Sequence, residues 1–191
     1  MSDIHFCIDL ETAGVSPNTM ILTIGVLAFD PPSGKILGEP FYERISIDSY
    51  RQYTPSFSLD GDTISWWMTQ SEEARLEAFC GERKELSDVL LAFIEWCRVI
   101  SNGKKIFIWS HGASFDVPIV SYALTTLGLE IPWKFWNIRD TRTLFDMVSL
   151  DFRTIGQVPV NNHMYPNHHA LGDCAKEIEG IKQSYQRLKR K

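Results

Sequence analysis

The sequence predicts an α/β fold in which a mixed β-sheet is flanked by helices. Two patterns support this fold class. The N-terminal part contains β-rich apolar runs joined by turn signals, which favours an antiparallel meander, and the rest of the chain alternates strand-like with helix-like segments. With 191 residues, of which 44% are apolar and 23% charged, the chain can bury a hydrophobic core, so residues 1–191 are expected to form a single domain.

The first predicted strand covers residues 4–11. Apolar side chains alternate there with a mixed set, and this period of two residues is typical of a β-strand. The mixed face carries Asp9 and Glu11, which are expected to lie about 6.5–7 Å apart along the strand. Two carboxylates at this separation can share a cation.

The next segments complete the predicted meander and begin the helical part. Residues 20–29 form a second β-rich run that ends in the turn signal DPPSGK, and residues 36–47 are expected to return as a third strand. Residues 48–60 have the composition of a loop. Helices are expected over residues 60–79, which begin with Asp and Thr as candidate caps, and from Leu86 onward, where apolar side chains follow three-four spacing.

A buried strand is predicted over residues 105–110, KIFIWS, with Asp116 a few residues beyond its end. Residues 117–128 are expected to form a helix that ends at a glycine. Because ligands collect at strand ends in such sheets, Asp116 is expected to lie near Asp9 and Glu11.

The C-terminal part is predicted as a weak strand near residues 136–140, a helix over 141–150, a loop over 151–167 and a final amphipathic helix. The apolar stripe of this last helix consists of Leu171, Cys174, Ile178, Ile181, Tyr185 and Leu188.

The bulk composition restricts the class of partner and the compartment. The formal net charge of -5 gives no global basic field, so contact with nucleic acid must come from local patches or from bound metal. The four cysteines form no CxxC pair, which favours a reduced compartment and a cytoplasmic location over a zinc knuckle or a disulfide framework. The sequence contains no segment typical of a signal peptide or a membrane span, and no membrane partner is expected.

Four distant acids, Asp9, Glu11, Asp116 and Asp173, are the candidate metal ligands. Two divalent cations held about 3.5–4 Å apart can activate a water molecule and stabilise the charge that develops when a phosphodiester is hydrolysed. Ligand sets made only of oxygen atoms favour Mg²⁺ or Mn²⁺ over zinc. We expect Asp9 to bridge the cations, Glu11 and Asp173 to complete the nucleophile-side site, and Asp116 to hold the second cation directly or through water.

His168 is the candidate general base. It lies five residues before Asp173, close to the predicted start of the last helix, and a free imidazole titrates near pH 6.5, so it can accept a proton at neutral pH. His163 and His169 compete for this role, but we expect both to be exposed loop residues. Each of these short motifs is common by itself, and their joint occurrence in this order carries the prediction.

The motifs DLET, SFD and HHALGDC resemble the three exonuclease motifs of the DEDDh group in the DnaQ-like, ribonuclease H-like superfamily. Two further blocks, DTISWWMTQSEEAR and PWKFWNIRDTRT, resemble T-even phage exonuclease A and mycobacterial-type 3′-to-5′ exoribonucleases. The resemblance extends from Ile4 to about Ile181. It implies a five-stranded mixed sheet, the metal ligands and histidine base named above, and release of 5′-mononucleotides from the 3′ end of a nucleic acid. One departure is His111-Gly112, where many superfamily members carry Asn.

Further residues are candidate contacts to the substrate: Thr12, Trp66, His111, Arg139 and Arg142. Adjacent tryptophans on a helix cannot face one core, so one of Trp66 and Trp67 should pack while the other borders the cleft, where a base could stack. The two arginines bracket Asp140, and either an ion-pair network with it or contact to phosphate would explain them.

Two alternatives to exonuclease action stay open at this point. A nuclease-like module could hold nucleic-acid ends or a partner protein without cutting, or catalysis could act on dinucleotides and short oligonucleotides. The sequence does not distinguish single-stranded DNA from RNA, because discrimination depends on contacts to the 2′-hydroxyl. The basic segment at residues 182–191 is most simply a solvated helix end whose cations complement the helix dipole, but it could also grip a nucleic-acid strand or another subunit, which leaves a homodimer open.

Overall fold

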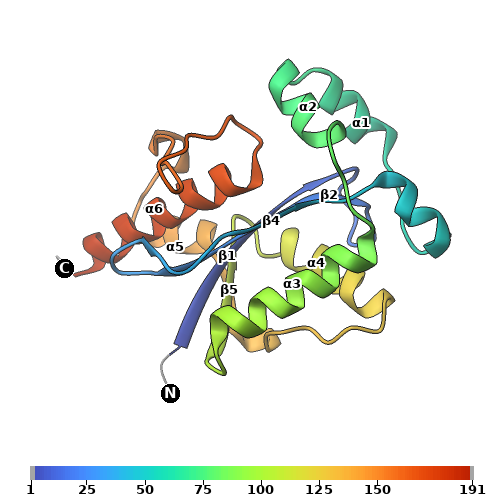
Figure 1. Cartoon of the computed structure of the whole chain (residues 1–191). Coiled ribbons are helices and arrows are strands. Elements are labelled where there is room, and N and C mark those ends of the chain that lie inside the picture. Colours follow the sequence, from blue (N-terminus) through green and yellow to red (C-terminus); the bar gives the residue numbers. More distant parts are fainter. Residues whose placement is uncertain (1–2, 190–191) are drawn as a thin grey trace.

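The structure is a computed structural model and describes residues 3–189; Arg190 and Lys191 of the basic C-terminal segment lie outside the described residues. Within that range a mixed β-sheet lies between layers of helices (Figure 1), which confirms the predicted fold class. The strands are β1 (Asp3–Thr12), β2 (Ile21–Asp30), β3 (Lys35–Ile36), β4 (Phe41–Arg44), β5 (Lys105–Ser110) and β6 (Ile138–Asp140). The α-helices are α1 (Gly61–Met68), α2 (Glu72–Phe79), α3 (Leu86–Ser101), α4 (Asp116–Thr126), α5 (Thr141–Met147) and α6 (Ala170–Leu188).

The strand order is β3-β2-β1-β5-β6, and β4 also pairs with β2. β1 runs antiparallel to β2 and parallel to β5, and β5 runs parallel to β6. The described part of the chain thus has a six-stranded sheet where five strands were expected. The extra strand arises because the predicted return strand over residues 36–47 is interrupted at Gly38 and Pro40, so that β3 and β4 pair with successive segments of β2. The sheet is still five strands wide.

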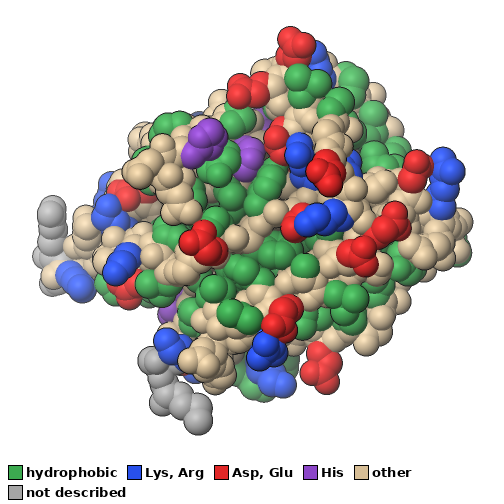
Figure 2. All heavy atoms as spheres, in the orientation of Figure 1, with side chains coloured by type: hydrophobic (Ala, Val, Ile, Leu, Met, Phe, Trp, Pro, Cys, Tyr) green, Lys and Arg blue, Asp and Glu red, His purple; other side chains and the backbone are tan. Residues whose placement is uncertain are grey.

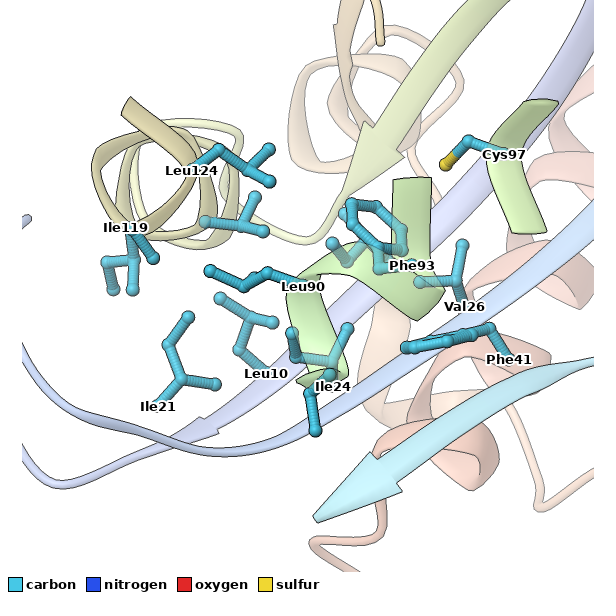
Figure 3. Close-up of a cluster of buried hydrophobic side chains, with 14 of the residues drawn as sticks. Leu10, Ile21, Ile24, Val26, Phe41, Leu90, Phe93, Cys97, Ile119 and Leu124 are labelled. Carbon is cyan, nitrogen blue, oxygen red and sulfur yellow. The ribbon is translucent and has the colours of Figure 1, made fainter. Parts of the chain in front are cut away.

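The larger hydrophobic core lies between the sheet and the helices α3 and α4. Leu90 of α3 and Leu124 of α4 converge there on Leu10 of β1 (Figure 3). Leu10 lies on the apolar face of β1 that the two-residue alternation predicts, and Leu90 belongs to the three-four stripe that was expected from Leu86 onward. This core fixes the end of β1 that carries the acidic residues.

Helices α5 and α6 cover the opposite face of the sheet, where a second cluster includes Cys7 of β1 and Cys174 of α6. The N-terminal end of α6 approaches β2 very closely: a Cβ atom placed on Gly25 would lie 2.6 Å from the Cβ atom of Ala170. Only glycine at position 25 allows this approach. As a result, the mixed face of β1 is buried under the helix that carries Asp173.

Helices α1 and α2 pack at the end of the sheet, away from the α3 and α4 layer (Figure 1). The helical segment predicted over residues 60–79 is divided in two because Ser71 caps a new helix, with its side chain accepting a hydrogen bond from the backbone of Ala74. The loop expected over residues 48–60 also contains part of a 3₁₀ helix, η1 (Ile47–Tyr53). Two further 3₁₀ turns are η2 (Phe135–Asn137) and η3 (Phe152–Thr154).

Figure 2 shows acidic and basic side chains interspersed over one face of the molecule, in agreement with a net charge of -5 and with the expectation that no broad basic field is present there. Among the described residues, no helix joins the length and the apolar character that crossing a membrane requires.

Candidate active site

Three elements bring the predicted acids together. Asp9 and Glu11 lie on β1, Asp116 is the first residue of α4 just after β5, and Asp173 lies in the first turn of α6. Because β1 and β5 are parallel neighbours, their carboxyl ends meet at the same edge of the sheet. Asp9, Glu11 and Asp173 each offer one carboxylate oxygen, and these oxygens all lie within 4.8 Å of one another.

Asp116 faces the same site from the neighbouring strand end. Its side chain is 4% exposed and accepts a hydrogen bond of 3.2 Å from the backbone N–H of Leu10, which holds it against β1. Asp116 lies outside the group of three carboxylates, but it lines the same cavity of about 340 Å³ as Asp9 and Asp173. All four predicted acids therefore meet in one region, with Asp116 to one side.

Burial and mutual repulsion make the ionised form of these carboxyl groups unfavourable. Burial, together with the carboxylates of Asp173 and Asp116, raises the pKa of Glu11 to about 8. Burial raises the pKa of Asp116 to about 7, although the hydrogen bond from Leu10 opposes the shift. Burial and the neighbouring acids also raise the pKa of Asp9 well above its ordinary value. The raised pKa values mean that these carboxylates bind protons to relieve their mutual repulsion. A hard divalent cation can replace those protons, because it prefers oxygen ligands and neutralises the same charge.

His168 lies beside this cluster, two residues before α6, with a positive φ of 60°. Its ring is partly exposed, lines the 340 Å³ cavity, and meets the rings of Trp66 and Trp67 edge-on at centroid distances of 5.3 and 6.2 Å. The left-handed backbone conformation turns the chain sharply before the helix begins. This turn places an imidazole next to the carboxylates, as the sequence predicts.

The two competing histidines differ from each other. His163 is exposed, as expected. For His169 the expectation is wrong: its ring is 6% exposed and lies against the rings of Tyr42 and Tyr165, at centroid distances of 4.5 and 4.0 Å. The close docking of α6 on β2 draws this residue, which immediately precedes the helix, into the interior.

A second cavity, of about 500 Å³, adjoins the first and is lined by Glu11, Thr12, Trp66 and Trp67. The two cavities share Leu10 and Phe115 as a common wall. The indole of Trp67 is 1% exposed and donates a hydrogen bond of 2.9 Å to the carbonyl oxygen of Thr12, whereas Trp66 is 45% exposed. The predicted division of the tryptophan pair is thus confirmed: Trp67 packs and Trp66 borders the cleft.

His111 lines the first cavity, and its Nδ1 lies 2.9 Å from the hydroxyl of Thr141. Burial lowers the pKa of His111 to about 4, with the Arg142 cation contributing, so the ring is neutral at pH 7. Gly112 has a φ of 103°, and a Cβ atom placed on it would lie 2.9 Å from the guanidinium of Arg142. Arg142 therefore occupies the space that a side chain at position 112 would need, and this chain has glycine at that position where many superfamily members carry asparagine.

Arg139 is not brought to the acidic cluster. Its guanidinium lies 4.5 Å from the ring centre of Phe107, whose strand partner is His5, and His5 precedes Asp9 by four residues, about 13 Å along β1. The proposed ion-pair network with Asp140 is also wrong for the described residues. Asp140 instead accepts hydrogen bonds from the backbone N–H groups of Ala113 and Thr143, and so caps α5.

Two residues of α6 line the first cavity although no sequence pattern predicted them as site residues, Lys176 and Glu177. Glu177 is 1% exposed and accepts a hydrogen bond from the thiol of Cys7 at 3.4 Å, and burial raises its pKa well above the ordinary value. The spacing could have identified it, because Glu177 follows Asp173 by four residues and so lies on the same helix face.

Comparisons with known proteins identify the family of this chain. A family model described as the Rv2179c-like 3′-5′ exoribonuclease domain matches residues 4–184. An exodeoxyribonuclease of Enterobacteria phage T4 is 31% identical over 202 aligned residues, which cover 91% of this chain and 85% of the phage protein.

Solved structures of nucleases share the fold. E. coli exonuclease I in complex with an oligonucleotide matches 99% of this chain with a TM-score of 0.62 and 17% identity, but this chain spans only 42% of that protein. The nuclease domain of 3′hExo, a DEDDh family member, bound to rAMP, matches with a TM-score of 0.55 and 14% identity over 98% of this chain and 92% of that domain. The expected nuclease fold is thereby confirmed, and the chain belongs to the family of Rv2179c-like 3′-5′ exoribonuclease domains.

Proposed function

We propose that this chain is a 3′-to-5′ exonuclease that hydrolyses the terminal phosphodiester bond of single-stranded DNA or RNA and releases 5′-mononucleotides. One observation carries the proposal: carboxylate oxygens of Asp9, Glu11 and Asp173 lie within 4.8 Å of one another, in a chain that belongs to a family described as 3′-5′ exoribonuclease domains. A free 3′ end is the proposed site of attack because the family description gives the direction of degradation as 3′ to 5′.

The acids are proposed to hold two Mg²⁺ or Mn²⁺ ions. Asp9, Glu11 and Asp173 would hold one, and Asp9 and Asp116 would hold the other, directly or through water. The all-oxygen donor set and the raised pKa of Glu11 support this assignment. When bound, such cations lower the pKa of water and stabilise negative charge on a phosphate group.

The other residues would position the substrate and move the proton. His168 lines the cavity of the acids, is partly exposed, and is proposed to accept the proton of the attacking water. The 500 Å³ cavity is proposed to hold the terminal nucleoside, with Trp66 stacking on its base and Thr12 beside its sugar. His111, which lines the cavity of the acids, and Arg142, whose guanidinium lies beside Gly112, would contact the strand.

Both nucleic acids are retained as substrates, because the family description names an exoribonuclease and the phage relative is named an exodeoxyribonuclease. The test is digestion of matched DNA and RNA oligonucleotides, single- and double-stranded, with Mn²⁺ or with EDTA. We expect 5′-mononucleotides from single strands with Mn²⁺ and none with EDTA or with the Asp9→Asn variant. Intact oligonucleotides under every condition would contradict the proposal and favour the non-cleaving binding module.

Three further predictions stay proposals. A single domain over residues 1–191 is supported by a family model that spans residues 4–184. A reducing cytoplasm suits the four free thiols of this chain. A homodimer is the third, and sedimentation of the purified protein would test it.

A further inference from the structure

The cavity that holds the acids contains one strongly cationic side chain, Lys176 of α6. Nucleic acid is a polyanion, and this cavity is also lined by Asp9, Asp116, Asp173 and Glu177. Because the chain carries a net charge of -5, attraction for a phosphate must come from a local cation. Lys176 forms no ion pair among residues 3–189, whereas Lys182 of the same helix pairs with Glu179 at 2.8 Å.

Aromatic rings hold Lys176 in place. Its ammonium lies 4.4 Å from the ring centre of Phe152, and the same ring stacks on His111 at a centroid distance of 4.1 Å. The Nδ1 of His111 is hydrogen-bonded to Thr141 at the start of α5, which anchors the stack. An aromatic face attracts a cation without pairing it to a carboxylate, so this ammonium remains available to an anion.

The two adjoining cavities define the direction of the bound strand. If the terminal nucleoside lies beside Trp66 in the 500 Å³ cavity, its 5′-phosphate reaches the acids across the shared wall of Leu10 and Phe115. The next nucleotide toward the 5′ end must then leave through the 340 Å³ cavity. That path runs along the wall formed by His111, Phe152 and Lys176.

We propose that Lys176 binds the first phosphate on the 5′ side of the scissile phosphate, so that the enzyme prefers substrates of three or more nucleotides over dinucleotides. This inference rests on the proposed exonuclease function and assigns the upstream phosphate subsite of the same active site. Lys176 is a binding residue in this account, since it meets a phosphate that does not react.

The test compares a dinucleotide and a trinucleotide that both carry a 5′-hydroxyl. The dinucleotide has only the scissile phosphate, whereas the trinucleotide has one more. We expect Lys176→Ala to raise KM for the trinucleotide by about three- to tenfold, as loss of one charged contact does, with kcat nearly unchanged. Both constants for the dinucleotide should stay as in the wild type.

Two variants serve as controls. Lys176→Arg keeps the cation and should retain most of the length preference. Lys105→Ala removes an ammonium that also lies over an aromatic ring, that of Phe107, but beside Asp3 at the opposite end of the sheet, and it should leave both substrates unaffected. On longer single strands, Lys176→Ala should also reduce the slope of log KM against log salt concentration by about 0.7, the value for one phosphate contact.

Equal effects of Lys176→Ala on both substrates, or a fall in kcat alone, would overturn the inference, because Lys176 would then act on the acids and not on an upstream phosphate. No effect on either substrate would overturn it too and leave the contact with Phe152 as a packing interaction. The proposed function is judged separately by the wild type: if neither oligonucleotide yields mononucleotides, that function fails as well.

Discussion

Replacing Asp9 by Asn should abolish hydrolysis and stabilise the metal-free protein. Asp9 lies on β1 close to Glu11 and Asp173, and the three carboxylate oxygens within 4.8 Å of one another repel when ionised. Two unit charges at 4.8 Å repel by about 3.5 kcal/mol if the effective dielectric constant is about 20. Bound protons remove part of this repulsion at pH 8, so we expect a gain of about 1–3 kcal/mol in the free energy of unfolding.

The stability gain from Asp9→Asn depends on pH, and its direction follows from the raised pKa values of Glu11, about 8, and Asp116, about 7. A carboxyl whose pKa is raised on folding destabilises the folded protein above its unfolded pKa, and the cost grows until pH exceeds the folded value. The gain from Asp9→Asn should therefore be largest near pH 8 and small near pH 4.

The assay is thermal unfolding of the wild type and the Asp9→Asn variant in EDTA at pH 5 and pH 8, beside a nuclease assay with Mn²⁺. A gain of about 1–3 kcal/mol corresponds to an increase in Tm of about 2–12 °C for a chain of this length. Activity should fall on the order of 10³-fold or more, because a metal ligand is lost. A lower Tm at pH 8, or retained activity, would refute the reasoning.

Three further changes test the remaining assignments. His168→Ala should lower kcat by about 10²- to 10⁴-fold, as loss of a general base does, with Mn²⁺ affinity by calorimetry nearly unchanged; a lost affinity would make His168 a ligand. Trp66→Ala should raise KM by about 5- to 100-fold through loss of base stacking, while Trp66→Phe keeps most of the affinity, and an unchanged KM in the alanine variant would exclude stacking. Binding of Mn²⁺ at pH 7 should release about one proton or more from Glu11 and Asp9, because the pKa values of both carboxyls are raised; calorimetry in buffers of different ionisation enthalpy measures this release, and no release would contradict the raised pKa values.

The elements that the sequence predicts well are those with a clear period. The alternation in residues 4–11 and the three-four stripe of α3 both report burial on one side, and the structure contains both elements. Short interruptions were harder to place. The break at Gly38 and Pro40 and the cap at Ser71 each divide a predicted segment, because one residue with special backbone chemistry ends an element that periodicity alone would continue.

In the site, the residues at strand ends were predictable and those placed by tertiary packing were not. Asp9 and Asp116 follow from the topology, because parallel strands end at one edge. The position of Arg139 depends on its contact with Phe107, and that of His169 on two tyrosine rings, neither of which leaves a signal in the local sequence. Glu177 was missed because its neighbours form the apolar stripe of α6, where a buried acid is unusual.

The most direct test of the account is time-resolved digestion of one single-stranded oligonucleotide, labelled in turn at its 5′ and its 3′ end, with Mn²⁺ and the wild-type chain. The account predicts immediate release of the 3′ label as a 5′-mononucleotide and stepwise shortening of the 5′-labelled strand, both stopped by EDTA. Immediate release of the 5′ label, internal cleavage, or turnover that EDTA leaves unchanged would contradict it.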